Sequence, residues 1–297
     1  MYPEAYRNDI IKNMFVDSAD DTYVAARWCY QVRLNTDFLW NAVHCLEKLM
    51  KAVLLFNGKS AKDHRHNLPN LYREVRDIAP DLLPDMLIKP NEIGDSECYW
   101  HLELSKNFIG RLYENGQAHN RYHVSGYGLH IFDICKLDRM VFAIRRLCCQ
   151  LHSCPFLGVP ATNRELLKKN PNHMSCWAGS RLKKLTDGKP GNSLASDQHA
   201  AELLRHAALN HNFMFAPVFA RDFVHDETIS AYMASQNPVL ERRIVRPYEE
   251  GATGKKAREI ACLAGWALDN IKLPPKFKKK FKDIRDTQGQ KYGGNPQ

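Results

Sequence analysis

The chain has 297 residues, of which 44% are hydrophobic, with 16 Gly and 15 Pro. This length allows one large or two ordinary domains, and this composition excludes a disordered or fibrous protein. The segment Met1–Asn13 lacks the continuous apolar core of a signal peptide, and no run approaches the roughly 18 apolar residues of a membrane span. The nine cysteines are an odd number without regular spacing, which favours reduced thiols. We therefore expect a globular cytoplasmic protein that does not enter a membrane.

The formal net charge of +9 is concentrated near the C-terminus. Residues 271–297 carry eight Lys or Arg and two Asp, a net charge of +6, which leaves +3 for the other 270 residues. Lysines gathered on a flexible segment can neutralise a polyanion without a preformed site. We expect residues 271–297 to be a flexible basic tail, with Lys278, Lys279 and Lys280 as candidate contacts to RNA. A tail that only keeps the protein soluble is the alternative.

Two amphipathic patterns predict long helices in the first half of the chain. Both repeat apolar residues at steps of three and four, which places them on one face of a helix. The first should end at Asn57-Gly58, where Gly can adopt the left-handed conformation, and the second should end before Pro155. We predict an antiparallel helical bundle of all-α class over residues 1–155. The apolar positions are Leu39, Val43, Leu46, Met50 and Val53, then Ile134, Leu137, Val141, Ile144, Cys148 and Leu151.

The second half of the chain also has helical patterns. The segments Asp197–Phe215 and Lys255–Asn270 should each form a helix that ends before a proline, Pro217 and Pro274 respectively. No segment shows the sustained apolar and polar alternation of a strand. We therefore predict that residues 156–270 form an additional helical region, either as a separate domain or packed on the first.

Part of the first half resembles the HEPN domain, a small all-α module of prokaryotic nucleotide and RNA biology. The stretch WNAVHCLEKLMKAVLLFNG, Trp40–Gly58, is followed by HRHNLPNLY, His64–Tyr72. These stretches are similar to the long HEPN helix with its Glu-Lys pair and to the His-Asn-Leu opening of the next helix. Tyr113 and Arg121-Tyr122 resemble residues of HEPN domains that accompany nucleotidyltransferases. The resemblance covers about half the chain, from about Asp20 to His152.

The resemblance implies a protein that binds RNA or a nucleotide and forms a homodimer. It also implies a nucleotidyltransferase-type or other partner, in a toxin–antitoxin or phage-defence type of system. The matching positions make Lys51, His66, Arg121 and Tyr122 candidate binding residues. A structural interpretation stays open, because Glu47 and Lys51 can support one helix and Asn67 can cap the next.

HEPN ribonucleases carry an Arg followed by a His after four to six residues, and two places in this chain have that spacing. The pairs are Arg146 with His152, and Arg205 with His211. An Arg fork can hold a phosphate, and a His can move the proton of a 2′-hydroxyl without a metal. On a regular helix, however, six residues leave the two side chains about 120° apart. Polar residues without a catalytic role are the alternative for both pairs.

A zinc site is a further alternative to our expectation that the protein has no cofactor. Cys149 and His152, together with His173 and Cys176, form two pairs with the two-residue gap of zinc ligands. Buried reduced cysteines explain the same thiols as small hydrophobic side chains. The five tryptophans are spread along the chain, which predicts core and interface packing rather than a platform for stacked bases.

Three functions follow from these patterns. The leading prediction is a HEPN-like protein that binds RNA or a nucleotide. The second is a metal-independent endoribonuclease that uses one of the two Arg and His pairs. The third is an assembly protein that keeps the HEPN scaffold without a catalytic site.

Overall fold

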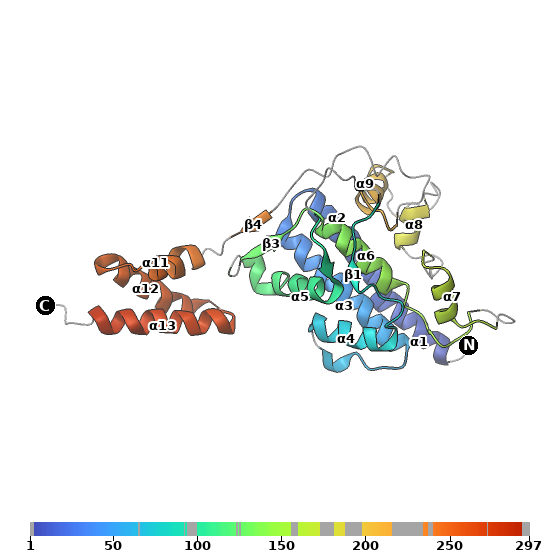
Figure 1. The fold of residues 1–297 in the computed structure, drawn as a ribbon, viewed down its shortest axis with the longest axis horizontal. Helices are drawn as coiled ribbons and strands as arrows, with labels where there is room; N and C mark the ends of the chain where they lie inside the picture. The colour runs from blue at the N-terminus through green and yellow to red at the C-terminus, as the bar shows by residue number, and fades with distance from the viewer. Residues whose placement is uncertain are drawn as a thin grey trace. The chain divides into compact units, whose positions relative to one another are not determined.

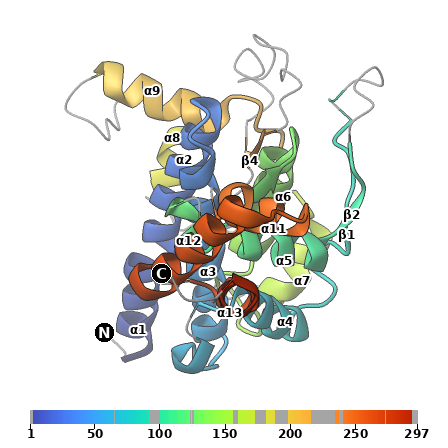
Figure 2. The same ribbon diagram turned by 90° about the vertical axis from the view of Figure 1, so that its left-hand side faces the viewer.

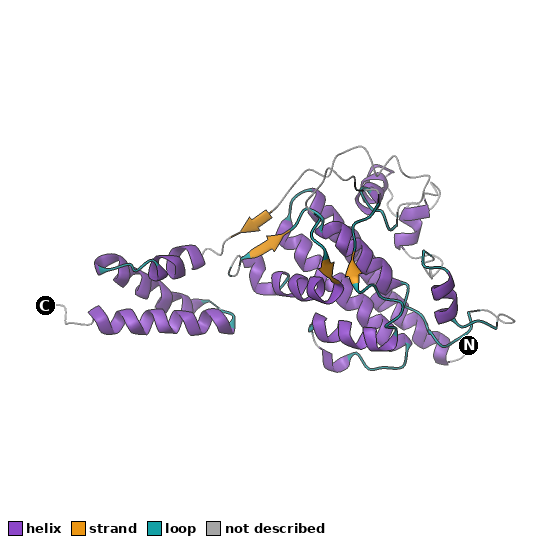
Figure 3. Cartoon of the chain, in the orientation of Figure 1, coloured by secondary structure: helices purple, strands orange, loops and turns teal. Residues whose placement is uncertain are grey.

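A computed structural model gives the fold, and it describes most but not all of the chain. The described residues are 3–64, 66–91, 93, 100–122, 124, 126–155, 160–172, 181–187, 198–215, 234–236, 240–271 and 273–292. They are mostly helical (Figure 3), which confirms the predicted all-α class. No helix in this described part combines the length and the apolar character that crossing a membrane requires.

The chain divides into two compact units, each of which is discontinuous in sequence. The first unit consists of Met1–Gly116 and His130–Met233, and the second of Gln117–Leu129 and Ala234–Gln297. Neither unit begins or ends near residue 155, where the sequence suggests a boundary. The reason is that helices after residue 155 pack back onto the helices before it.

The first unit is a helical bundle with short flanking helices. Its helices are α1 (Pro3–Ile11), α2 (Ser18–Gln31), α3 (Asn35–Phe56), α4 (Leu68–Ile78), α5 (Ser105–Asn115), α6 (Asp133–Arg145), α7 (Asn163–Lys169), α8 (Arg181–Asp187) and α9 (Gln198–Leu209). A π-helical segment, Lys12–Asp17, joins α1 to α2, and a short 3₁₀ turn, Lys62–His64, precedes α4. The long helices α2, α3 and α6 lie side by side (Figure 1), while α4 and α5 pack on α3, and α8 and α9 pack on α2.

Helix α3 is the central helix of this unit and follows the first predicted pattern. All five apolar positions of that pattern are buried. The helix ends at Phe56, and Gly58 has a φ of 76°, as expected for a residue in the left-handed conformation after a helix. The sequence prediction is therefore confirmed for this helix.

Helix α6 is shorter than its apolar pattern predicts. The pattern continues to Leu151, but the helix ends at Arg145. The Asn57 side chain accounts for the change, because it donates to the Cys149 carbonyl at 3.1 Å and accepts from the Leu151 amide at 3.1 Å. These two hydrogen bonds take the place of backbone hydrogen bonds of a longer helix. Leu147, Cys148 and Leu151 stay buried although they lie outside the helix.

Helix α4 begins where the sequence suggests. Asn67 is its N-cap and accepts a hydrogen bond from the Asn70 amide at 3.1 Å.

Two short strands, β1 (Met86–Leu87) and β2 (Glu103–Leu104), run antiparallel beside one another (Figure 2). Helix α5 follows β2 directly, so this pairing sets where α5 starts relative to α4.

Two buried ion pairs join α2 to α6. Arg145 donates to both carboxylate oxygens of Asp20 at 2.6 and 2.8 Å, and Arg27 donates to Asp138. Tyr23 also donates to Asp138, at 2.6 Å. Seven residues separate the two charges on each helix, about two turns, so both lie on one face. Because Asp precedes Arg on both helices, only an antiparallel arrangement pairs opposite charges.

The same network holds the end of α9. Arg27 donates to the Ala207 carbonyl at 2.9 Å and to the Asn210 carbonyl, and the side-chain Nδ2 of Asn212 donates to the Tyr23 hydroxyl at 2.9 Å. The helix predicted to reach Phe215 ends at Leu209. Carbonyl groups at its end are satisfied by a buried guanidinium, which ties residues 198–215 to the bundle.

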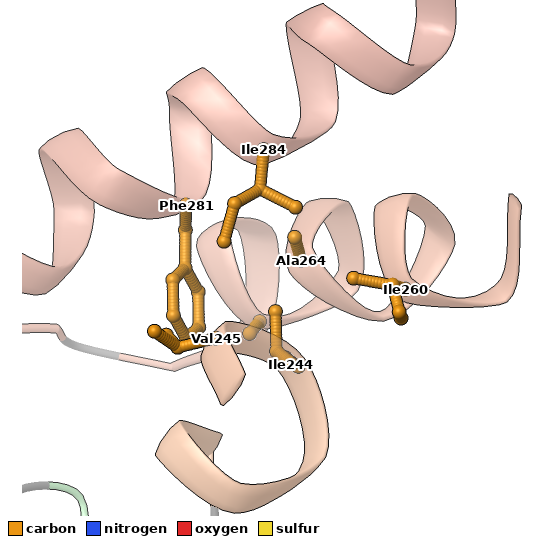
Figure 4. Close-up of a cluster of buried hydrophobic side chains, with 7 residues drawn as sticks. Ile244, Val245, Ile260, Ala264, Phe281 and Ile284 are labelled. Atoms are coloured by element: carbon orange, nitrogen blue, oxygen red, sulfur yellow. The ribbon is translucent and has the colours of Figure 1, made fainter. Parts of the chain in front are cut away.

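The second unit is a small helical bundle with a two-stranded ribbon. It contains a 3₁₀ turn (Ala118–Tyr122), strands β3 (Tyr127–Leu129) and β4 (Ala234–Gln236), a π-helical segment (Glu241–Val245), and helices α11 (Arg246–Glu249), α12 (Gly254–Asn270) and α13 (Pro275–Tyr292). The strands β3 and β4 pair antiparallel. The bundle core is drawn in Figure 4 and contains Ile244, Val245, Ile260, Ala264, Ala267, Phe281 and Ile284.

The prediction of a flexible tail over residues 271–297 is wrong for most of that segment. Residues 275–292 form α13, and Phe281 and Ile284 are fully buried against the rest of the bundle core. Burial of apolar side chains on one face stabilises the helix, and the lysines are left on its other faces. The high lysine content conceals this apolar spacing in the sequence.

Loss of one partner of the Asp20 and Arg145 pair should destabilise the fold far more than replacement of both. We expect Asp20→Ala to lower the free energy of unfolding by about 3–5 kcal/mol, because it leaves a buried guanidinium without its carboxylate. The double variant Asp20→Leu with Arg145→Met should recover most of that loss. Chemical denaturation of both variants measures this, with Lys169→Ala as an exposed control. A double variant no more stable than Asp20→Ala would contradict the expectation.

Candidate functional site

Four polar side chains gather at the surface where α3 faces the start of α4. Glu47 accepts a hydrogen bond from Lys51 Nζ at 2.6 Å, and His66 Nδ1 lies 3.1 Å from both carboxylate oxygens. His44 Nδ1 lies 3.6 Å from the same carboxylate. We call these four residues, His44, Glu47, Lys51 and His66, the α3 cluster. The sequence predicted Lys51 and His66 as binding residues, and the structure brings these two together around Glu47.

Glu47 is the centre of the α3 cluster and is almost fully buried, with 4% of its surface exposed. Burial by itself would raise its pKa. Hydrogen bonds from His44, Lys51 and His66 outweigh that effect and lower the pKa of Glu47 from 4.5 to about 2. The carboxylate is therefore ionised at neutral pH and holds the positions of the surrounding nitrogens.

The two imidazoles of the α3 cluster differ in their access to solvent. The His66 side chain is 77% exposed, whereas that of His44 is 25% exposed and its ring packs edge-on against Trp40 with centroids 4.1 Å apart. The two imidazole centroids are 6.2 Å apart. When His66 Nδ1 donates to Glu47, its Nε2 keeps a lone pair that can accept a proton from a ligand. This geometry is suited to acid–base chemistry.

Arg146 of the first predicted ribonuclease pair holds another helix. Its guanidinium donates to the carbonyls of Leu167, Asn170 and Pro171 at 2.6, 3.1 and 2.6 Å. These carbonyls lie at the end of α7, where a cation is favourable. His152 lies in the turns after α6 and is exposed. The terminal nitrogens of Arg146 thus have structural acceptors in place of a phosphate.

The second predicted pair lies at the end of α9. Arg205 belongs to the helix, while His211 follows its last residue and has a φ of 51°. The six-residue spacing therefore does not run along one continuous helix, contrary to the sequence-based expectation. The proposed catalytic role of this pair stays a prediction.

The predicted zinc ligands lie only partly in the described residues. Cys149 is buried, and its thiol donates to the Arg146 carbonyl at 3.8 Å, whereas His152 is exposed. His173 and Cys176 lie outside the described part of the chain. Within the described part, no three His, Cys, Asp or Glu residues are grouped as metal ligands. The zinc site remains a prediction.

The remaining predicted binding residues belong to the second unit. Arg121 and Tyr122 lie in its 3₁₀ turn, where Tyr122 is 78% exposed; the Arg121 side chain lies outside the description. Lys278 and Lys279 of α13 are exposed, while Lys280 is paired with Glu249 at 2.7 Å. The candidate residues are thus distributed over both units.

One aromatic residue on the surface of this second unit was not predicted from the sequence. Trp266 of α12 is 55% exposed and therefore does not belong to the core of the unit. Leu263, one turn earlier on the same helix, is 44% exposed. Their spacing relative to the buried Ala264 and Ala267 places them away from the core, and this pattern is the signal that could have revealed them.

Comparisons with known proteins add no constraint on this site. The chain matches no family model, no curated protein and no solved structure. The HEPN resemblance therefore stays an expectation from the sequence motifs.

Replacement of the central carboxylate should reveal its electrostatic role. We expect Glu47→Gln to lower the free energy of unfolding by about 1–3 kcal/mol at pH 7, because three nitrogens lose an ionised acceptor. The pKa of Glu47 is lower in the folded protein than its ordinary value of 4.5, so the ionised carboxylate stabilises the fold fully above pH 4.5. This contribution to the free energy of unfolding is lost as the pH falls from 4.5 towards 2.

Urea denaturation of the wild type and Glu47→Gln at pH 7 and at pH 3 measures this effect. The difference between the two proteins should shrink at the lower pH. Glu74→Gln is a matched control, because the Glu74 side chain is more exposed than that of Glu47 and pairs with one imidazole, that of His64, at 3.3 Å among the residues described. An equal loss of stability at both pH values would contradict a carboxylate-specific contribution.

Proposed function

We propose that this protein binds RNA through the basic helices of its second unit. The observation that carries this proposal is the segregation of charge. Residues 117–129 and 234–297 contain fifteen Lys or Arg and seven Asp or Glu, a net charge of +8 out of +9 for the whole chain. A folded unit with this excess attracts phosphates and releases their counterions, which is the main source of nucleic-acid affinity.

Helix α13 offers an ordered row of cations. Lys278, Lys282 and Arg285 are exposed and follow the spacing of three to four residues that places side chains on one helical face. Phe281 and Ile284 face the core, so the direction of the row is fixed by burial. A row along a helix can contact several successive phosphates of one strand.

Trp266 supports RNA as the ligand, because an exposed indole can stack on an unpaired base. The choice of RNA over DNA rests on the HEPN resemblance. The homodimer, the nucleotidyltransferase-type partner, the defence setting and the cytoplasmic location are parts of the same proposal and rest on that resemblance and on composition.

Removal of two charges from the row should weaken RNA binding and change its salt dependence. We expect Lys278→Gln with Lys282→Gln to reduce the slope of log affinity against log salt concentration by about 2. Fluorescence anisotropy with a labelled single-stranded oligoribonucleotide measures both quantities. The matched control is Lys59→Gln with Lys169→Gln, two exposed lysines of the first unit.

The control should bind with nearly the wild-type slope. Equal slopes in both double variants would show that the contact is not with α13. An absence of salt-dependent binding in the wild type would remove the proposal.

A second proposed function is metal-independent RNA cleavage at the α3 cluster. The observation that favours it is the exposed His66 held by a buried carboxylate beside a second imidazole and Lys51. His66 would take the proton of the 2′-hydroxyl as its oxygen attacks phosphorus. The bond from phosphorus to the 5′-oxygen breaks, His44 protonates that oxygen, and a 2′,3′-cyclic phosphate remains. Lys51 adds positive charge near the developing anion.

Loss of His66 should reduce such cleavage without reducing binding. We expect His66→Ala to slow cleavage of an end-labelled oligoribonucleotide in the presence of a chelator by roughly a hundredfold or more. His101→Ala is the matched control because His101 is also exposed. The corresponding oligodeoxyribonucleotide should not be cleaved, since it lacks the nucleophile. Unchanged cleavage in His66→Ala would exclude this site.

A further inference from the structure

A cavity of about 660 Å³ lies between α4 and the start of α5 in the first unit. One wall is a single face of α4, formed by Pro69, Tyr72, Arg73 and Arg76. These residues are spaced by three, one and three positions, which aligns them along one side of the helix. Its volume is within the usual range for sites that hold a small organic molecule.

The opposite wall is fixed by the short strand pair. Leu104 pairs with Met86 at the end of β2, and the Ser105 amide donates to the Asp85 carbonyl at 2.9 Å. The Ser105 hydroxyl donates to the Pro84 carbonyl at 2.7 Å. These bonds place Leu104 and Lys106 opposite α4 without relying on flexible side chains.

The charge of the cavity favours an anion. Arg73, Arg76 and Lys106 line it together with one acidic residue, Asp85, so the balance is +2. Arg76 donates to Asp85, which leaves Asp85 already paired. Arg73 and Lys106 are exposed and lie on opposite walls, so both can reach a ligand between them.

Tyr72 is part of the apolar surface of this wall. It is only 3% exposed and lines the cavity, and its hydroxyl lies beside the side chains of Ser105 and Arg76. Because neighbouring side chains surround the hydroxyl, the aromatic ring contributes apolar surface to the wall. Pro69 and Leu104 add apolar surface beside these polar groups.

We propose that this cavity binds a small organic phosphomonoester. The phosphate lies between Arg73 and Lys106, while the organic part contacts Pro69 and Leu104. A phosphate dianion matches the charge of the cavity, and the apolar wall distinguishes an organic ester from inorganic phosphate. This site lies in the first unit and does not rest on RNA binding by α13.

Isothermal titration of the full chain with phenyl phosphate tests the proposal. We expect saturable binding that is tighter than that of inorganic phosphate, and no binding of phenol. Arg73→Gln with Lys106→Gln should weaken phenyl phosphate binding by about tenfold or more. The control Lys59→Gln with Lys169→Gln removes the same charge elsewhere and should bind like the wild type.

A terminal phosphate of an oligonucleotide has the same chemistry and provides a second arm. If it uses the cavity, a 5′-phosphate should raise the affinity of the wild type, but not of Arg73→Gln with Lys106→Gln. If the wild type and the double variant differ in their affinity for phenyl phosphate but not for the 5′-phosphorylated oligonucleotide, the ligand of the cavity is a small molecule. The absence of saturable phenyl phosphate binding, or equal affinity in the wild type and the double variant, would overturn the proposal. RNA binding through α13 is measured separately and does not affect this outcome.

Discussion

The antiparallel contact between α2 and α6 is the constraint on which the first unit depends. Two oppositely directed ion pairs, Asp20 with Arg145 and Arg27 with Asp138, fix both the direction and the register of the two helices. A parallel arrangement would place like charges in a buried interface, where the energy cost is large. Burial raises the pKa of the Asp20 carboxyl, and the guanidinium of Arg145 counteracts that rise. The network also holds the end of α9, and this contact explains why helices distant in sequence belong to one compact unit.

Helix α3 connects this constraint to the candidate chemistry. One of its faces packs against α2 and α6, and the edge next to α4 carries the α3 cluster. Because the helix is held on several sides, Glu47 remains buried while it accepts hydrogen bonds from partly exposed side chains. A carboxylate in this position stabilises the fold and also orients the His66 ring. The same interaction therefore contributes to stability and to the proposed proton transfer.

The two units differ in how they could recognise anions. In the second unit, a small apolar core fixes the faces of α12 and α13, and the cations remain exposed. Such a surface suits an extended polyanion that is bound through its phosphates, without sequence-specific contacts. In the first unit, the cations of α4 and α5 line a cavity that also has apolar walls. That arrangement suits one small ligand, because shape and hydrogen bonds select it.

The sequence alone determined the helical class, the central helix α3 and the N-cap at Asn67. These features depend on local patterns, namely apolar periodicity and the short-range hydrogen bond of a capping side chain. The Glu47 and Lys51 pair was also visible, because residues four apart are neighbours on any helix.

Only the tertiary structure decided where α6 ends, which residues surround Glu47 and which charges lie buried. The Asn57 side chain interrupts the end of α6 from another helix, and Arg146 holds α7 despite a spacing typical of a ribonuclease motif. The lysine-rich C-terminal segment forms a helix because Phe281 and Ile284 find a core to pack against. Each of these outcomes depends on contacts between residues far apart in the chain, and local periodicity carries no information about such partners.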